Sequence, residues 1–280
     1  MGIKQFIHRM SVHGVLRPIA KPIHSGLTLI AFMCERLLDG LFTAKEDQAF
    51  LNEDLTAVIK TFERPEILHR LIKSLRHFYP EMKVIVVDDS FKPTKLEGVE
   101  TIIMPYDSGV SAGRQEALKH IQTPYMMLLD DDFVFYRHTR VIPVLEKLQK
   151  LPEVDIIGGE VIYLPFYRKI DYTKAAIHPT NAIPLRAPGT QIGGMTAYDK
   201  VANFYIARTD SIRKVGWDLQ IKRLDHADFF TRAKGVLLTV FDPDFKVLHA
   251  RTPFDREYMS KRLDVHEDRL LLKDKYYFNG

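Results

Sequence analysis

The sequence has only one cysteine, Cys34, so no disulfide can form within the chain. A lone cysteine is typical of a reducing compartment, and we expect a cytoplasmic protein. The sequence also lacks a long uninterrupted apolar run and the pattern of a signal peptide. Its most apolar window, residues 26–42, contains Glu35, Arg36 and Asp39, and is too short and too charged to span a bilayer.

Residues 26–42 instead favour an amphipathic helix. The simpler interpretation is a helix that packs on the protein core. The alternative is a helix that contacts a membrane surface and makes the protein membrane-peripheral. This alternative would be assisted by basic residues upstream, namely Lys4, Arg9, Arg17 and Lys21.

A block of basic residues is missing as well. Lys and Arg number 40 against 36 Asp and Glu, and they are spread along the chain. We expect no nucleic-acid binding, because the sequence has neither a basic block nor a recognisable binding motif. The pI of 8.9 suits another anionic partner, such as a nucleotide diphosphate or an anionic membrane surface.

What the sequence does contain is an alternation of apolar, β-rich runs with helical patterns. We expect strands over residues 55–61, 83–89, 101–104 and 125–129, and helices from Pro65 to Pro80, over 114–121 and over 139–150. This order predicts an α/β fold with a mostly parallel, doubly wound sheet flanked by helices.

The second half of the chain is less regular. We expect strands over 155–164, 201–207, 236–241 and 246–250, short helices over 210–215 and 225–234, and a long loop over 167–195. The pattern divides the chain into an N-terminal helical extension (1–52), a central domain (53–255) and a charged helical tail (256–280).

Acidic residues gather where the predicted strands end. Ligands of doubly wound sheets bind at the carboxyl ends of the strands, where Thr61, Asp88, Asp89 and the triplet Asp130-Asp131-Asp132 fall. Three adjacent carboxylates repel one another unless a cation or donor neutralises them, and Mg²⁺ and Mn²⁺ prefer oxygen ligands. In an extended segment residues i and i+2 share a side, so we expect Asp130 and Asp132 to face one metal while Asp131 points elsewhere. The plainer alternative is a solvated turn.

Two further segments suit a nucleotide. A carboxylate at a strand end, such as Asp88 or Asp89, can bind a base or ribose, although an Asx turn cap explains it equally well. Residues 109–114 lead into a helix whose N-terminus would attract phosphate, and Arg114 could pair with phosphate oxygens. A surface arginine on a tight turn is the alternative.

Two late residues suit acid–base or metal chemistry. Asp228 lies in the first turn of a predicted helix and could act as a general base, or could simply be a helix N-terminal acid. His249 ends a predicted strand and could be a neutral metal ligand, or a buried structural histidine.

In combination these residues resemble a family, the nucleotide-diphospho-sugar transferases of the GT-A fold. More narrowly, the chain resembles the animal β-1,4-N-acetylgalactosaminyltransferases that make gangliosides GM2 and GD2. The likeness covers about residues 53 to 250 and rests on Lys60-Thr61-Phe62-Glu63-Arg64, Asp88-Asp89-Ser90, Ala112-Gly113-Arg114, the Asp130 triplet with Phe133-Val134-Phe135, Ala207-Arg208-Thr209-Asp210, and His226 with Phe229-Phe230.

The resemblance implies an inverting transfer of a hexose, such as GalNAc or Gal, from a UDP-sugar to a glycan or glycolipid hydroxyl, with Mn²⁺ or Mg²⁺. Asp228 would be the base, where the ganglioside enzymes carry Glu. Asp132 would bind the metal, with Asp130 shared between metal and ribose and His249 as a late ligand. The UDP-sugar site would comprise Thr61, Arg64, Asp88, Asp89, Arg114, Asp130 and Asp131.

Two other functions are compatible with such a fold. A sugar nucleotidyltransferase would need a glycine-rich loop after the first strand, and residues 61–65 contain no glycine. A non-catalytic module that binds nucleotide-sugars remains open.

Overall fold

The sheet at the centre of the molecule is built around four parallel strands. The computed structural model describes residues 16–42, 51–171 and 176–278. Strands β1 (Leu55–Thr61), β2 (Lys83–Asp88), β3 (Glu100–Ile103) and β4 (Tyr125–Asp130) pair in parallel in the order β3-β2-β1-β4. Every residue of β1 is buried, as expected for a strand covered on both faces. The predicted parallel sheet is thus confirmed.

Helices on both sides of these strands follow the predicted periodicity. Helix α4 (Pro65–Phe78) starts on a proline and buries Leu68, Leu71, Ile72 and Leu75. Helix α5 (Val110–His120) starts after Gly109, whose φ of 97° favours glycine; a Cβ there would lie 2.4 Å from the Lys222 Cγ. Helix α6 (Val141–Lys150) packs along the sheet, and the short α3 (Leu51–Asp54) precedes β1.

The second half extends the sheet with mixed pairing. The order continues β4-β10-β6-β11-β9-β8, where β9 is Met195–Ala197 and β8 is Gln191–Ile192. Strand β10 (Tyr205–Arg208) is antiparallel to both β4 and β6 (Ile156–Tyr163). The expected strands over 236–241 and 246–250 are instead one strand, β11 (Thr239–His249), which pairs in parallel with β6. The two-strand prediction was wrong because a bulge between Asp242 and Lys246 accommodates Pro243 without ending the strand.

Smaller elements complete this half. The expected strand over 201–207 begins only at Tyr205, and the long loop over 167–195 contains β7 (Arg168–Lys169), β8 (Gln191–Ile192) and the start of β9 (Met195–Ala197). Strand β5 (Phe133–Val134) pairs with the end of β11. Helices α7 (Thr209–Val215) and α8 (Asp225–Ala233) follow β10, close to their predicted bounds.

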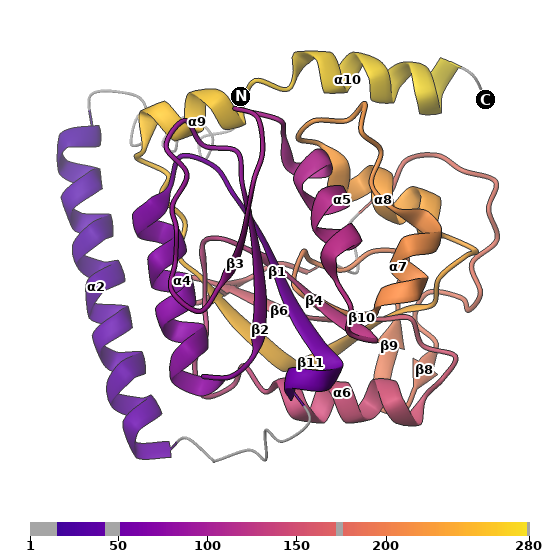
Figure 1. Ribbon diagram of the computed structural model, residues 1–280, viewed down its shortest axis with the longest axis horizontal. Coiled ribbons are helices and arrows are strands. Elements are labelled where there is room, and N and C mark those ends of the chain that lie inside the picture. The colour runs from indigo at the N-terminus through magenta and orange to yellow at the C-terminus, as the bar shows by residue number, and fades with distance from the viewer. Residues whose placement is uncertain (1–15, 43–50, 172–175, 279–280) are drawn as a thin grey trace.

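The two ends of the chain are helical. Helix α2 (Arg17–Phe42) is longer than the predicted 26–42 and lies along α4, while α9 (Arg256–Arg262) and α10 (His266–Lys273) cross the carboxyl ends of the strands (Figure 1). A π-helix, Asp274–Phe278, ends the described chain. Within the described ranges, no helix is long and apolar enough to cross a membrane.

Candidate active site

A cleft of about 320 Å³ opens at the carboxyl ends of β1 and β4. The first half of the chain lines it with Lys60, Thr61, Arg64, Asp89, Arg114 and the Asp130 triplet, and the second half with Asn203, Arg223, Asp225, His226, His249, Tyr258 and Arg262. The predicted position at the strand ends is therefore confirmed for most of the candidate residues. The lining contains six aspartates against five lysines and arginines.

Arg64 gathers two carboxylates of the triplet. Its guanidinium forms ion pairs with Asp131 and with Asp132, where the Nη1 to Oδ2 distance is 3.2 Å. Thr61 donates a hydrogen bond of 2.9 Å to Asp131. The predicted alternation is therefore wrong: Asp131 and Asp132 share one cation, and Asp130 faces another. The physical reason is that β4 ends at Asp130, so residues 131 and 132 lie in a turn rather than in extended backbone.

His249 completes this part of the cleft. Its Nε2 lies 2.8 Å from Oδ1 of Asp132, because β5 pairs antiparallel with the end of β11 and brings Phe133 opposite His249. Both ring nitrogens are buried, and within the described residues neither makes a hydrogen bond of normal geometry. Burial acts to raise the pKa of Asp132, but the charges of His249 and Arg64 outweigh it and hold that pKa well below its usual range.

Arg114 joins the two halves of the cleft. It is buried in α5 and donates to Asp130 from the first half (2.8 Å) and to Asp225 from the second (2.6 Å). The Asp130 side chain is 35% exposed, whereas that of Asp225 is 5% exposed. Burial raises the pKa of the Asp225 carboxyl against the opposing charge of Arg114.

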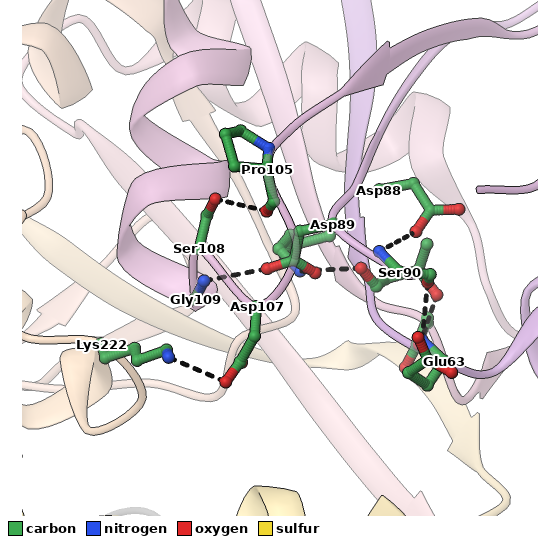
Figure 2. Close-up of polar contacts among 12 residues, drawn as sticks. Glu63, Asp88, Asp89, Ser90, Pro105, Asp107, Ser108, Gly109 and Lys222 are labelled. Atoms are coloured by element: carbon green, nitrogen blue, oxygen red, sulfur yellow. Dashed lines mark hydrogen bonds and ion pairs between the residues drawn. The ribbon is translucent and has the colours of Figure 1, made fainter. Parts of the chain in front are cut away.

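The adjacent carboxylates Asp88 and Asp89 have different surroundings. Asp89 forms an ion pair with Lys60 and accepts a 2.9 Å hydrogen bond from the Gly109 amide, so it fixes the loop before α5 to the cleft. Asp88 accepts from the amide of Ser90 at 2.9 Å (Figure 2). It also accepts from the amide of Thr94 at 2.8 Å and thus holds its own loop. Asp89 lines the cleft, whereas Asp88 is not among the described residues that line it. Burial lowers the pKa of Lys60.

Asp228, the predicted base, is buried and is not among the described residues that line the cleft. Its carboxylate is 1% exposed and accepts hydrogen bonds from Arg232 (2.9 Å), Lys275 (2.7 Å) and the Tyr276 hydroxyl (2.7 Å). Asp228 is absent from the described lining of the cleft, whereas Asp225 and His226 belong to it. Nε2 of His226 lies 2.7 Å from the Val201 carbonyl, and burial lowers the pKa of His226 to about 3.

The donor atoms can be tested against a divalent metal. In the part of the chain that the structure describes, no three His, Cys, Asp or Glu side chains gather to hold one. Asp132 and His249 nevertheless lie in contact on one wall of the cleft and offer carboxylate oxygens and ring nitrogens there. Mg²⁺ and similar ions are commonly held by one or two carboxylates together with substrate phosphates, so these residues fit a metal that completes its shell with a diphosphate.

Several cleft residues were missed by the sequence analysis. Tyr258 and Arg262 come from α9, and the Tyr258 ring lies 3.8 Å from the Arg64 guanidinium carbon. Nothing in their local sequence indicates this contact, because it depends on how the tail folds back over the strand ends. Only a weak feature of the sequence pointed to Asp225, namely that it begins the same predicted helix as Asp228.

Comparisons with known proteins agree with this geometry. The sequence model "Glycosyl transferase family 2" matches residues 56–216. Human β-1,4 N-acetylgalactosaminyltransferase 1 is 34% identical over 213 residues, covering 70% of this chain and 39% of the human protein. Mouse β-1,4 N-acetylgalactosaminyltransferase 2 is 34% identical over 206 residues, covering 71% and 40%. The chain therefore spans about two fifths of the length of these relatives.

A solved structure shows the same architecture. S. aureus TarS 1-349 in complex with UDP-GlcNAc matches with a TM-score of 0.59 at 16% identity, covering 79% of this chain and 66% of that chain. At this identity the likeness concerns the fold, and it confirms the predicted GT-A fold.

Proposed function

The chain belongs to glycosyl transferase family 2, and we propose that it is a nucleotide-sugar glycosyltransferase that transfers a hexose from a UDP-sugar, with inversion and with Mn²⁺ or Mg²⁺, to a hydroxyl of a glycan or glycolipid. The observation that carries this proposal is the balance of charge in the cleft. Six aspartates already match five basic residues, so a bound diphosphate needs a further cation.

The first half of the cleft would hold the donor. Thr61, Arg64 and Asp89 would contact uridine, and Asp130, the most exposed of the triplet, would contact ribose or metal. Arg114 would contact the diphosphate from the start of α5. Asp132 and His249 would hold the metal ion, with Asp131 setting the position of Arg64. When bound, the ion would supply positive charge to the departing diphosphate.

The second half would hold the acceptor and take its proton. The resemblance assigns that role to Asp228, but three donors already occupy its carboxylate. Asp225 lies in the same first turn of α8, lines the cleft, and has a pKa raised by burial, which favours accepting a proton. We therefore favour Asp225 as the base and keep Asp228 as the alternative. On this assignment the hydrogen bonds that Asp228 accepts from its three donors hold α8 in place. Attack by the acceptor hydroxyl from the face opposite the leaving group would invert the anomeric centre.

A donor screen tests the proposal. UDP release is measured with UDP-GalNAc first, because the curated relatives are N-acetylgalactosaminyltransferases, and then with UDP-GlcNAc and UDP-Gal, each with Mn²⁺ and with EDTA. We expect release that depends on Mn²⁺ and a product of inverted anomeric configuration by NMR. Release that is equal in EDTA would contradict the metal assignment, and retained UDP binding without turnover of any donor would indicate a binding module.

A further inference from the structure

Helix α2 turns its apolar side away from the protein. Seven of the eight large exposed apolar side chains described on α2 recur at helical spacing and form one stripe, which we name the α2 stripe: Ile19, Ile23, Leu27, Ile30, Met33, Leu37 and Leu41. Leu37, for example, is 67% exposed. A surface helix of a globular protein ordinarily shows the opposite arrangement, with its apolar stripe on the core.

Polar contacts hold the inner side of the same helix. Glu35 and Asp39 are buried; Arg137 forms an ion pair with Glu35, and its amide donates a 2.9 Å hydrogen bond to Asp39. The Tyr167 hydroxyl donates to Glu35 at 2.8 Å, and Arg17 donates to the Phe254 carbonyl at 3.0 Å. These contacts fix the rotation of α2 about its axis, so the exposure of the stripe is imposed by the fold.

The space between α2 and α4 is open and basic. A cavity of about 690 Å³ there is lined by six lysines and arginines against three acidic residues, and Arg17 and Lys21 come from α2 itself. A second cavity of about 610 Å³ lies farther along α2 and shares Phe32 and Arg70 with the first. Arg17 and Lys21 therefore lie on the polar side of α2 that faces α4, opposite the α2 stripe.

We propose that α2 lies flat on an anionic lipid bilayer, with the α2 stripe among the acyl chains and the cations of its polar side, Arg17 and Lys21, reaching toward the headgroups. No described helix is long and apolar enough to cross a membrane, but an aliphatic face opposed to a polar face that carries Lys and Arg is the pattern of an interfacial helix. The stripe contains only Ile, Leu and Met, without the aromatic and arginine anchors that dominate interfaces between proteins, and this favours lipid over a second protein chain.

The single cysteine provides the probe. Cys34 is exposed, and at four residues from Ile30 and three from Leu37 it lies on the edge of the stripe. The full chain is labelled there with an environment-sensitive NBD fluorophore and titrated with vesicles of phosphatidylcholine containing about 30% phosphatidylserine, or of phosphatidylcholine alone. We expect a blue shift and increased emission with the anionic vesicles, and weaker binding to the neutral ones.

A matched pair of variants separates the stripe from general surface hydrophobicity. Ile30→Glu/Leu37→Glu places charges on the stripe, and Ile183→Glu/Leu219→Glu makes the same change at side chains that are equally exposed elsewhere, Leu219 being 65% exposed. In co-sedimentation of the unlabelled proteins with anionic vesicles, we expect the first variant to lower the partition coefficient by about tenfold or more and the second by less than about twofold. Circular dichroism checks that both variants are folded.

Three results would overturn the proposal. The first is an NBD spectrum that anionic vesicles leave unchanged. The second is an equal loss of sedimentation in the two variants. The third is a blue shift without lipid that grows with protein concentration and disappears in Ile30→Glu/Leu37→Glu, which would assign the stripe to a second copy of the chain.

Discussion

The two halves of the cleft use their carboxylates in different ways. In the first half three carboxylates of the rim are paired with a cation from the same half: Asp89 with Lys60, and Asp131 and Asp132 with Arg64. In the second half Asp225 and Asp228 lie in one helical turn, yet Asp225 reaches across to Arg114 and Asp228 faces the tail of the chain. The first half, which we propose binds the donor, thus holds these carboxylates in ion pairs, while the second half places Asp225 in the cleft and Asp228 against the tail.

Loss of Asp132 should have the largest effect, because it removes the carboxylate that we assign to the metal. We expect Asp132→Asn to lower kcat/KM for UDP-sugar turnover by about 10³-fold or more. The measurement is initial-rate UDP release at saturating Mn²⁺. Asp210→Asn, at an exposed surface ion pair, serves as the control and should change the rate by less than about twofold. A loss below tenfold in Asp132→Asn would mean that the first half does not hold the metal there.

Replacing Asp225 and Asp228 by Asn, one at a time, should affect different properties: the catalytic rate in the first variant and the stability in the second. We expect Asp225→Asn to lower kcat by about 10²- to 10⁴-fold with little change in UDP affinity. Asp228→Asn should instead lower the free energy of unfolding by roughly 2 to 4 kcal/mol, because Arg232 and Lys275 lose a buried partner. Urea unfolding and single-turnover kinetics at a temperature where both variants are folded distinguish the two. The reverse pattern would return the base role to Asp228.

Replacement of Arg114 tests the link between the halves. Arg114→Lys keeps the charge, but one ammonium cannot hold Asp130 and Asp225 together as the planar guanidinium does. We expect kcat/KM to fall by about tenfold, a smaller loss than for either catalytic change. If the double variant Arg114→Lys/Asp225→Asn is as slow as Asp225→Asn alone, the two residues act as one unit. Fully additive losses would argue against that link.

The smallest expected effect is the contribution of His226 to the pH dependence of stability. Its pKa is about 3 in the folded protein against 6.5 for the ordinary side chain, so the unfolded chain binds the proton first as pH falls. Its contribution to stability is therefore complete above pH 6.5 and is lost progressively as pH falls toward 3. We expect His226→Asn to unfold with a shallower loss of stability between about pH 7 and pH 5 than wild type in urea titrations. Parallel curves would show that His226 is not held neutral.

The parts of the cleft that could be predicted are those fixed by local sequence. The apolar run of β4 leads directly into Asp130, and the pairing of parallel strands then places Thr61 and Asp89 on the same edge. The direction of Asp131 could not be predicted, because it depends on where the strand gives way to a turn. The choice between Asp225 and Asp228 depends on the rotation of α8, which the burial of Phe229 and Phe230 sets against the sheet.

The orientation of helix α2 could not be predicted from local sequence either. Its amphipathic pattern was predicted, and the pattern alone favoured an apolar side on the core. The buried acids Glu35 and Asp39 reverse that orientation through Arg137, a contact about a hundred residues away in sequence. The division of the chain at residues 52 and 255 stays a prediction, although Tyr258 and Arg262 show that the tail contributes directly to the cleft.

The central claim is that the cleft binds a nucleotide diphosphate through a metal held by Asp132 and His249. Titration calorimetry of UDP into the wild-type chain, with Mn²⁺ and with EDTA, tests it most directly. We predict that Mn²⁺ tightens UDP binding by about tenfold or more and that Asp132→Asn abolishes this gain. Equal affinity for UDP with and without Mn²⁺ in the wild-type chain would contradict the account.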